Sequence, residues 1–457
     1  MSLTSGTRTV LKPRTTSGLA AAMTVAATLY AAFVAYAAVW TTYQTWVALV
    51  VVPVLLLVSV PMLVRAGRRD PDPRFLKLLV IAFVLKVFAT VARYLMAFVL
   101  YNGTADAKGY DGNGARLAEA YRQGIFDADI GRDLIGTGFV RVATGVLYTF
   151  TGQSVFVAYA VFSWLGFWGL YFLYRAFRVA LPDCDARRYA MCVLLLPSMM
   201  FWPSGLGKEA WMTFGIGLAA YGAALLLSGD RRWILPLALG MTATSMVRPH
   251  ITAALFAGLA AAYVIGRSAR PSTEVTPLAR LVAIGCLLAA SFVVVHEAAD
   301  FLGVEEVTVS NVDSAIDDTT EQTATGDSSF RPEKVDSPAD FPMAALSVLF
   351  RPFLFEARNA QMLVAATEST LLFALFVMAA PRMRGLQSRL RRQPYLLMCI
   401  FYSVLFVYAF SNFSNFGILT RERVQVLPFV LVFLALPRPT TIRPGGRAID
   451  HHQGVNA

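Results

Sequence analysis

Long apolar segments separated by short polar connections make up most of the 457-residue chain. These segments cover residues 18–41, 44–64, 75–101, 153–180, 189–203, 207–228, 233–247, 250–267, 278–300, 361–380, 394–411 and 423–437. About 20 helical residues cross the hydrocarbon core of a bilayer, so the shorter segments are expected to be tilted, half-buried or re-entrant. The pattern predicts an all-α, polytopic transmembrane protein with about twelve spans.

Three stretches between the apolar segments predict other structures. Residues 134–150 carry Arg141 and three glycines, which favours an interfacial or re-entrant helix over a further span. Two long connections, 102–136 and 301–342, lie outside the spans. A short helix is expected over Ala115–Gln123 in the first. The second has ten acidic residues against Arg331 and Lys334, as in a solvated, partly disordered loop.

Composition and charge agree with a membrane protein and set its orientation. With 56% hydrophobic and 15% charged residues, the chain has too little polar surface for a soluble protein of this length. Lysine and arginine recur in alternate short connections, at residues 8–14, 65–74, 175–188, 231–232, 267–280, 381–393 and 438–447. Such connections face the cytoplasm. The net charge of +11 therefore reflects topology and gives no reason to expect a nucleic-acid partner.

This orientation divides the chain into three parts. Residues 1–17 and 438–457 are predicted to be cytoplasmic tails, and residues 18–437 a single transmembrane domain. The loops 102–136 and 301–342 are then extracytoplasmic. The four cysteines have no metal-ligand spacing and indicate no disulfide framework.

Several charged side chains lie in short connections on the outer side, where the positive-inside bias disfavours cations. The stretch FWPSGLGKEAW at 201–211, a sharp turn between two apolar segments, is one such connection. The candidates for binding substrate among these charges are Lys208, Glu209, Arg248, His250, Arg351, Glu356, Arg421 and Arg423. Each could be an interfacial side chain that reaches water. Together they predict a site for an anionic ligand such as phosphate, with the glutamates holding the cations in place.

Three further charges lie inside predicted spans. Lys86 and Arg93 are seven residues apart on one face of the third span, and Glu368 lies about two turns into the tenth. Ionisable residues at such depth usually have a partner, so a pairing of Lys86 with Glu368 is a hypothesis.

Asp106 and Asp111 in the first outer loop are the candidate catalytic residues. A carboxylate at the membrane surface can act as a general base for a sugar hydroxyl, or can ligate a divalent cation that carries a phosphate. The alternative is that both aspartates only form turns and cap a helix. Asp106 is the preferred candidate because it is closest to the end of a span.

Four stretches resemble proteins that build bacterial envelope polysaccharides. The loop sequence ADAKGY at 105–110 resembles the acidic first loop of GT-C glycosyltransferases, although here the loop follows the third span and not the first. The stretches LPSMMFWPSGLGKEA, LFRPFLFEARN and FGILTRERVQVLPF are similar to segments of actinobacterial membrane proteins from polysaccharide clusters, including polymerase-like ones.

The resemblance implies a GT-C-like fold in a bacterial cytoplasmic membrane, with the active face outside. It implies transfer of a sugar from a polyprenyl-phosphate-type donor to a cell-envelope glycan, with Asp106 as the base and the outward cations binding phosphate. A divalent cation (Mg²⁺ or Mn²⁺) that carries the phosphate is a further possibility that the sequence leaves open. A Wzy-like polymerase of lipid-linked oligosaccharides and a transporter or flippase of lipid-linked glycans are the alternative functions.

Overall fold

A computed structural model describes residues 16–101, 106–131, 133–266, 285, 328–333, 335 and 337–438. Four predicted features lie wholly or largely outside these residues. They are the N-terminal tail to residue 15, the apolar segment 278–300 apart from Gly285, the second long loop as far as residue 327, and the C-terminal tail beyond residue 438.

The chain folds into helices joined by short turns. The first part contains α1 (Thr16–Trp40), α2 (Tyr43–Arg68), α3 (Phe75–Leu95), η1 (Met96–Leu100), α4 (Asp106–Arg122), η2 (Leu134–Gly138), α5 (Phe139–Thr151), α6 (Val155–Ala180), α7 (Ala186–Leu195), α8 (Pro197–Phe201), α9 (Lys208–Leu227), η3 (Arg231–Trp233), α10 (Ile234–Ser245) and α11 (Pro249–Ile265). The second contains α14 (Phe341–Phe350), η4 (Leu354–Glu356), α15 (Ala360–Ala379), η5 (Ala380–Met383), α16 (Leu386–Arg392), α17 (Pro394–Phe410), α18 (Phe416–Glu422), η6 (Arg423–Gln425), α19 (Leu427–Leu431) and η7 (Val432–Ala435). Within these described parts the β-structure is limited to an isolated bridge between Ser329 and Asn415.

Six helical segments among the described residues are long and apolar enough to cross a membrane. They are Tyr43–Arg68, Phe75–Leu100, Leu134–Thr151, Val155–Ala180, Lys208–Leu227 and Ala360–Met383. The pair α16 and α17, bent by 111°, would add a seventh if it formed one span. The prediction of an all-helical membrane protein is thus confirmed for the described residues, whereas twelve spans and a GT-C fold stay predictions.

Several predicted spans form shorter helices than expected. The segment 189–203 divides at Pro197 into α7 and α8, because proline cannot continue the hydrogen bonding of a helix. The segment 423–437 divides into η6, α19 and η7, and residues 422–436 are all buried. Apolar sequence there reflects burial in protein, which hydropathy does not distinguish from contact with lipid.

The two helices nearest the first long loop also differ from expectation. The helix predicted at Ala115–Gln123 begins earlier, at Asp106, because its glycines are helical. Gly114 packs on α5, where a Cβ would lie 2.5 Å from Thr144 Cγ2. Leu134–Thr151 has non-helical backbone angles at Ile135 and Gly136, which leaves α5 with 13 residues. At 1.5 Å per residue, α5 alone is about 20 Å long, so the segment Leu134–Thr151 approaches the thickness of a bilayer core only with its non-helical start included.

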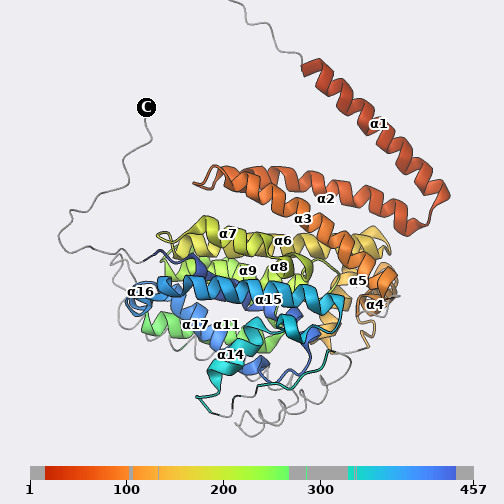
Figure 1. The fold of residues 1–457 in the computed structure, drawn as a ribbon. Coiled ribbons are helices and arrows are strands. Elements are labelled where there is room, and N and C mark those ends of the chain that lie inside the picture. Colours follow the sequence, from red (N-terminus) through yellow and green to blue (C-terminus); the bar gives the residue numbers. More distant parts are fainter. Residues whose placement is uncertain are drawn as a thin grey trace, which may run out of the picture.

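The centre of the bundle depends on close backbone contact between α6 and α9. A Cβ at Gly217 would lie 2.2 Å from the carbonyl oxygen of Gly169, and a Cβ at Gly169 would lie 2.3 Å from that of Thr213. Small residues permit such approach between membrane helices. In Figure 1, α2 and α3 lie on one side of this pair and α15, α17 and α11 on the other.

The bundle has two distinct ends and an exposed apolar surface. Figure 1 places α4 and α5 at one end and α16 at the opposite end, while α1 extends away from the bundle. Large apolar side chains on the long helices are exposed, among them Leu57 on α2 at 69% and Val364 on α15 at 67%. Such surface is expected where helices contact lipid, so the environment of this protein is a bilayer.

Candidate functional site

The turn between α8 and α9 forms part of the wall of the candidate site. Its residues pack against α6: a Cβ at Gly166 would lie 2.6 Å from the carbonyl oxygen of Pro203, and a Cβ at Gly205 would lie 3.0 Å from Tyr159. Helix α9 then begins at Lys208, with Glu209 in its first turn. A carboxylate is favourable there because the N-terminus of a helix carries partial positive charge.

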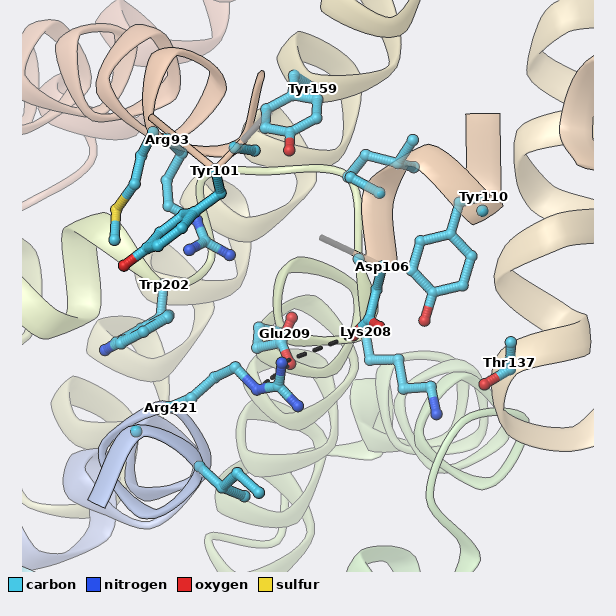
Figure 2. Close-up of a pocket in the computed structure, with 18 of the residues that line it drawn as sticks. Arg93, Tyr101, Asp106, Tyr110, Thr137, Tyr159, Trp202, Lys208, Glu209 and Arg421 are labelled. Atoms are coloured by element: carbon cyan, nitrogen blue, oxygen red, sulfur yellow. Dashed lines mark ion pairs between the residues drawn. The ribbon is translucent and has the colours of Figure 1, made fainter. Parts of the chain in front are cut away.

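A cavity of about 810 Å³ opens above this turn, and charged side chains from six parts of the chain line it. They are Arg93 of α3, Asp106 of α4, Arg141 of α5, Lys208 and Glu209 of α9, Arg248 before α11, and Arg421 of α18. Figure 2 shows Arg93, Asp106, Lys208, Glu209 and Arg421 around one space. The structure therefore brings together five of the predicted site residues and adds Arg93, which the sequence placed only inside a span.

Glu209 connects two of the arginines. Its Oε1 lies 3.1 Å from Arg421 Nε and 3.9 Å from Arg248 Nη2, and Arg421 Nη1 lies 3.7 Å from Asp106 Oδ2. The negative charge of Glu209 raises the pKa of Arg421 above its ordinary value. Burial lowers the pKa of Arg248 to about 10. Both guanidinium groups are therefore charged at neutral pH.

A second carboxylate, that of Glu422, also binds the guanidinium group of Arg248. Arg248 Nη2 donates a hydrogen bond to Glu422 Oε1 at 2.6 Å, and Gln425 Nε2 donates to Glu422 Oε2 at 2.5 Å. Glu422 is 3% exposed. Sequence reasoning missed this residue, although the signal was present: a lone acidic residue between two arginines in LTRERVQ.

Arg93, Arg141 and Lys208 differ from Arg248 and Arg421, because none of the three has an ion pair with a described carboxylate. The Arg93 guanidinium carbon lies 4.9 Å from the centre of the Trp202 ring and 5.1 Å from that of Phe201. Its Nε is buried and has no hydrogen-bond partner among the described residues. In Figure 2, Arg93 lies on one side of Glu209, and Lys208 lies on the other. Arg141 Nη1 donates to the carbonyl oxygen of Ile130 at 2.8 Å. The cavity thus holds three cations whose charge no ion pair with a described carboxylate neutralises.

Tyr110 adds a hydrogen-bond donor beside Lys208. Burial raises the pKa of its hydroxyl to about 12, so Tyr110 keeps its proton at neutral pH. Figure 2 shows its hydroxyl on the same side of the cavity as Lys208 and Thr137. Tyr110 was part of the quoted loop motif but was not predicted as a site residue.

Asp111 and His250 do not line this cavity. Asp111 Oδ1 accepts a hydrogen bond from the Tyr148 hydroxyl at 2.6 Å, and its Oδ2 accepts one from Gln153 Nε2 at 3.0 Å. Asp111 therefore fastens α4 to α5 and to the start of α6. His250 is in the first turn of α11, with its ring centre 6.4 Å from that of Phe410.

Arg351, Glu356 and Arg423 form a neighbouring cluster outside the cavity. Arg351 Nη2 pairs with Glu356 Oε1 at 2.5 Å, and the Arg351 guanidinium carbon lies 4.7 Å from the centre of the Phe330 ring. Arg423 is 1% exposed and donates to the carbonyl oxygens of Leu349 and Arg351, each at 3.0 Å. These contacts join α14, η4 and η6, which is a structural role for Arg423.

Lys86 and Glu368 bind opposite ends of the five-residue helix α8 instead of each other. Lys86 Nζ donates to the carbonyl oxygen of Met200 at 3.1 Å, and Glu368 Oε2 accepts from the backbone N–H of Ser198 at 2.8 Å. The break before Pro197 leaves these backbone groups without partners inside a helix. A carboxylate at the N-terminus and an ammonium at the C-terminus also match the helix dipole.

The carboxylates of the cavity do not fit a protein-bound metal ion. Among the described residues no three His, Cys, Asp or Glu side chains gather as metal ligands. Asp106 and Glu209 both pair with Arg421, and Asp111 is occupied by Tyr148 and Gln153. We therefore derive no chemical step through a divalent cation bound by these side chains.

Comparison with protein-family models, with curated proteins and with solved structures finds no match for this chain in any of the three. The resemblance to GT-C glycosyltransferases and polysaccharide polymerases therefore stays a prediction.

Proposed function

We propose that the cavity binds the phosphate of a polyprenyl-phosphate-type lipid that carries a sugar, and that the protein is a glycosyltransferase. The acceptor would be a cell-envelope glycan on the extracytoplasmic face. One observation supports this proposal above all: Arg93 and Lys208 line the cavity, and neither has an ion pair with a described carboxylate. Cations in a partly dehydrated site favour an anionic ligand, and phosphate accepts hydrogen bonds from both side-chain types.

Sugar transfer in this cavity needs a base and a stabilised leaving group. The oxygen of an acceptor hydroxyl attacks the anomeric carbon, and the bond from that carbon to the phosphate oxygen breaks. The phosphate leaves with the electron pair, which Arg93 and Lys208 stabilise. The hydroxyl proton passes to the carboxylate of Asp106. The Asp106 side chain is 73% exposed, so an acceptor can reach it from water.

Glu209 is a positioning residue in this scheme. It lies between Arg421 and Arg248 and reduces the repulsion between them before a ligand binds. Because Glu209 is 9% exposed and already engaged by two cations, it is not the base.

Polymerisation of lipid-linked oligosaccharides is the second candidate. The cavity has four arginines, Arg93, Arg141, Arg248 and Arg421. They favour this function, because such a site must hold anionic groups of two lipid-linked substrates. A transporter or flippase is less favoured. Transporter sites lie near the middle of the bilayer, whereas α4, whose Asp106 lines this cavity, lies at one end of the bundle (Figure 1).

The proposal is tested with purified protein and a radiolabelled polyprenyl-phosphate sugar. Lys208→Ala should weaken binding of the lipid phosphate by about 10- to 100-fold, the usual effect of removing a charged hydrogen bond. Asp106→Asn should retain binding and lose about 100-fold or more in transfer. Lys108→Ala is the matched control, because Lys108 is exposed on the same helix as Asp106 and does not line the cavity.

Full transfer by both Asp106→Asn and Lys208→Ala would overturn the proposed site. Supplying a soluble glycan acceptor in one reaction and a lipid-linked oligosaccharide in another separates the transferase from the polymerase.

A further inference from the structure

A second cavity, of about 510 Å³, lies directly beside the first. The two share Met96, Trp202, Gln361 and Gly417 in their walls. The Tyr101 hydroxyl, which lines the first cavity, donates to Gln361 Oε1 at 2.7 Å and so ties the end of η1 to the start of α15 at this boundary. The two cavities therefore adjoin along a wall formed by these four residues.

The walls of the two cavities differ in chemistry. The first is lined by the charged side chains described above. The second is lined mainly by apolar and aromatic groups, including Leu100, Phe201, Val364, Ala365 and Phe416. A charged cavity that adjoins an apolar one is complementary to an amphipathic molecule with an anionic group at one end.

The apolar cavity also reaches the lipid-facing surface. Leu100 at the end of η1 is 70% exposed and Val364 on α15 is 67% exposed, and both belong to segments long and apolar enough to span a membrane. Exposed apolar side chains on such helices face hydrocarbon. The cavity is therefore accessible from the bilayer between η1 and α15.

We propose that the second cavity holds the hydrocarbon chain of the lipid whose phosphate occupies the first. This inference rests on the proposed function for its choice of ligand, and it adds where the chain lies and how the lipid enters. The phosphate passes Trp202 and Gln361 to reach Arg93 and Lys208, while the chain remains between η1 and α15.

The buried side of the second cavity limits how deep the chain can lie. Three polar atoms there have no hydrogen-bond partner among the described residues: Ser198 Oγ, Glu368 Oε1 and Arg423 Nε. Hydrocarbon against these atoms would leave them unpaired, which is unfavourable. These atoms favour water over hydrocarbon, so we place the chain in the outer part beside Leu100, Val364 and Phe416.

The test uses farnesyl phosphate with a photoreactive diazirine on its chain, bound to the purified protein in detergent. After irradiation, mass spectrometry locates the labelled peptides. The reaction is repeated with excess unmodified farnesyl phosphate, and label that this competitor removes (competable label) marks a specific site. We expect competable label on the peptides that contain Leu100 and Val364. Competable label that is absent from both peptides, or lies elsewhere, overturns the inference.

Variants on α15 provide a matched comparison. Ala365→Trp fills the cavity and should reduce competable label several-fold. Val377→Trp, on the same helix but outside the cavity and 58% exposed, should leave it unchanged. Equal labelling of both variants overturns the inference. The map in the unaltered protein is informative even if Ala365→Trp does not fold.

The neutral alcohol farnesol separates this inference from the proposed function. If farnesol displaces the label as well as farnesyl phosphate does, the phosphate proposal fails while the chain site stands. If farnesyl phosphate alone displaces label that maps elsewhere, the phosphate proposal stands and the chain site fails.

Discussion

Glu422 and Arg248 form a buried ion pair on which the charged cavity depends. Their side chains are 4% and 10% exposed. Removing one partner of such a pair leaves the other charge buried without compensation. We therefore predict that Glu422→Ala lowers the free energy of unfolding by about 3–5 kcal/mol. Thermal unfolding in detergent measures the change. Glu119→Ala is the control: Glu119 pairs with Arg122 at 3.7 Å and is 64% exposed, so its loss should cost less than about 1 kcal/mol. Equal losses of stability in the two variants would contradict the role given to Glu422.

Substitution by asparagine should have opposite effects at the two candidate aspartates: loss of transfer at Asp106, and loss of stability at Asp111. Asp111→Asn replaces a charged acceptor with a neutral amide, which weakens the contacts with Tyr148 and Gln153. We expect a loss of about 1–3 kcal/mol in stability with transfer per folded molecule unchanged. Transfer and unfolding temperature are measured on the same preparation. If Asp111→Asn abolishes transfer without lowering stability, Asp111 belongs to the site and the assignment of Asp106 is wrong.

At the scale of single residues, the sequence identifies charges at helix ends but not their partners. Lys208, Glu209, Arg248 and Arg421 were predicted as one set because topology places their connections on the same side of the membrane, and they share one cavity. Arg423 was predicted with them and is instead fully buried. Nothing local separates Arg421 from Arg423, because only the packing of α18 and η6 against other helices decides which side chain faces the cavity.

Among the helices, the close contact between α6 and α9 tolerates little change. A Cβ at Gly217 would meet the backbone of Gly169 at 2.2 Å, and backbone cannot move aside cheaply. Gly217→Ala should therefore lower stability by about 1–3 kcal/mol. The same substitution at Gly112 of α4, where nothing lies within 4 Å, should be neutral or gain up to about 1 kcal/mol from helix propensity. Fluorescence-detected size-exclusion chromatography after heating compares the two variants. A Gly217→Ala protein as stable as the unaltered one would contradict close backbone contact between α6 and α9 at this position.

Hydropathy predicted the long helices well and the short ones poorly. The predicted segments 44–64 and 153–180 correspond to α2 and α6 within a few residues. The segment 423–437 has the same apolar character but forms three short pieces, all buried. Its apolar side chains contact other helices, and a sequence has no local mark that distinguishes a protein interior from a bilayer.

For the whole molecule, the two ends of the bundle give opposite predictions for chemical labelling from outside the cell. Helix α16 and the turn before it carry five arginines between residues 381 and 393, which predicts that this end faces the cytoplasm. Helix α4, whose Asp106 lines the charged cavity, lies at the opposite end (Figure 1). Gly112 and Ser388 are exposed at these two ends. In a variant whose four native cysteines are replaced by serine, Gly112→Cys should react with a membrane-impermeant maleimide in intact cells. Ser388→Cys should react only after the membrane is permeabilised. The reverse pattern would place the cavity on the cytoplasmic side, and an extracytoplasmic glycan could then not be its acceptor.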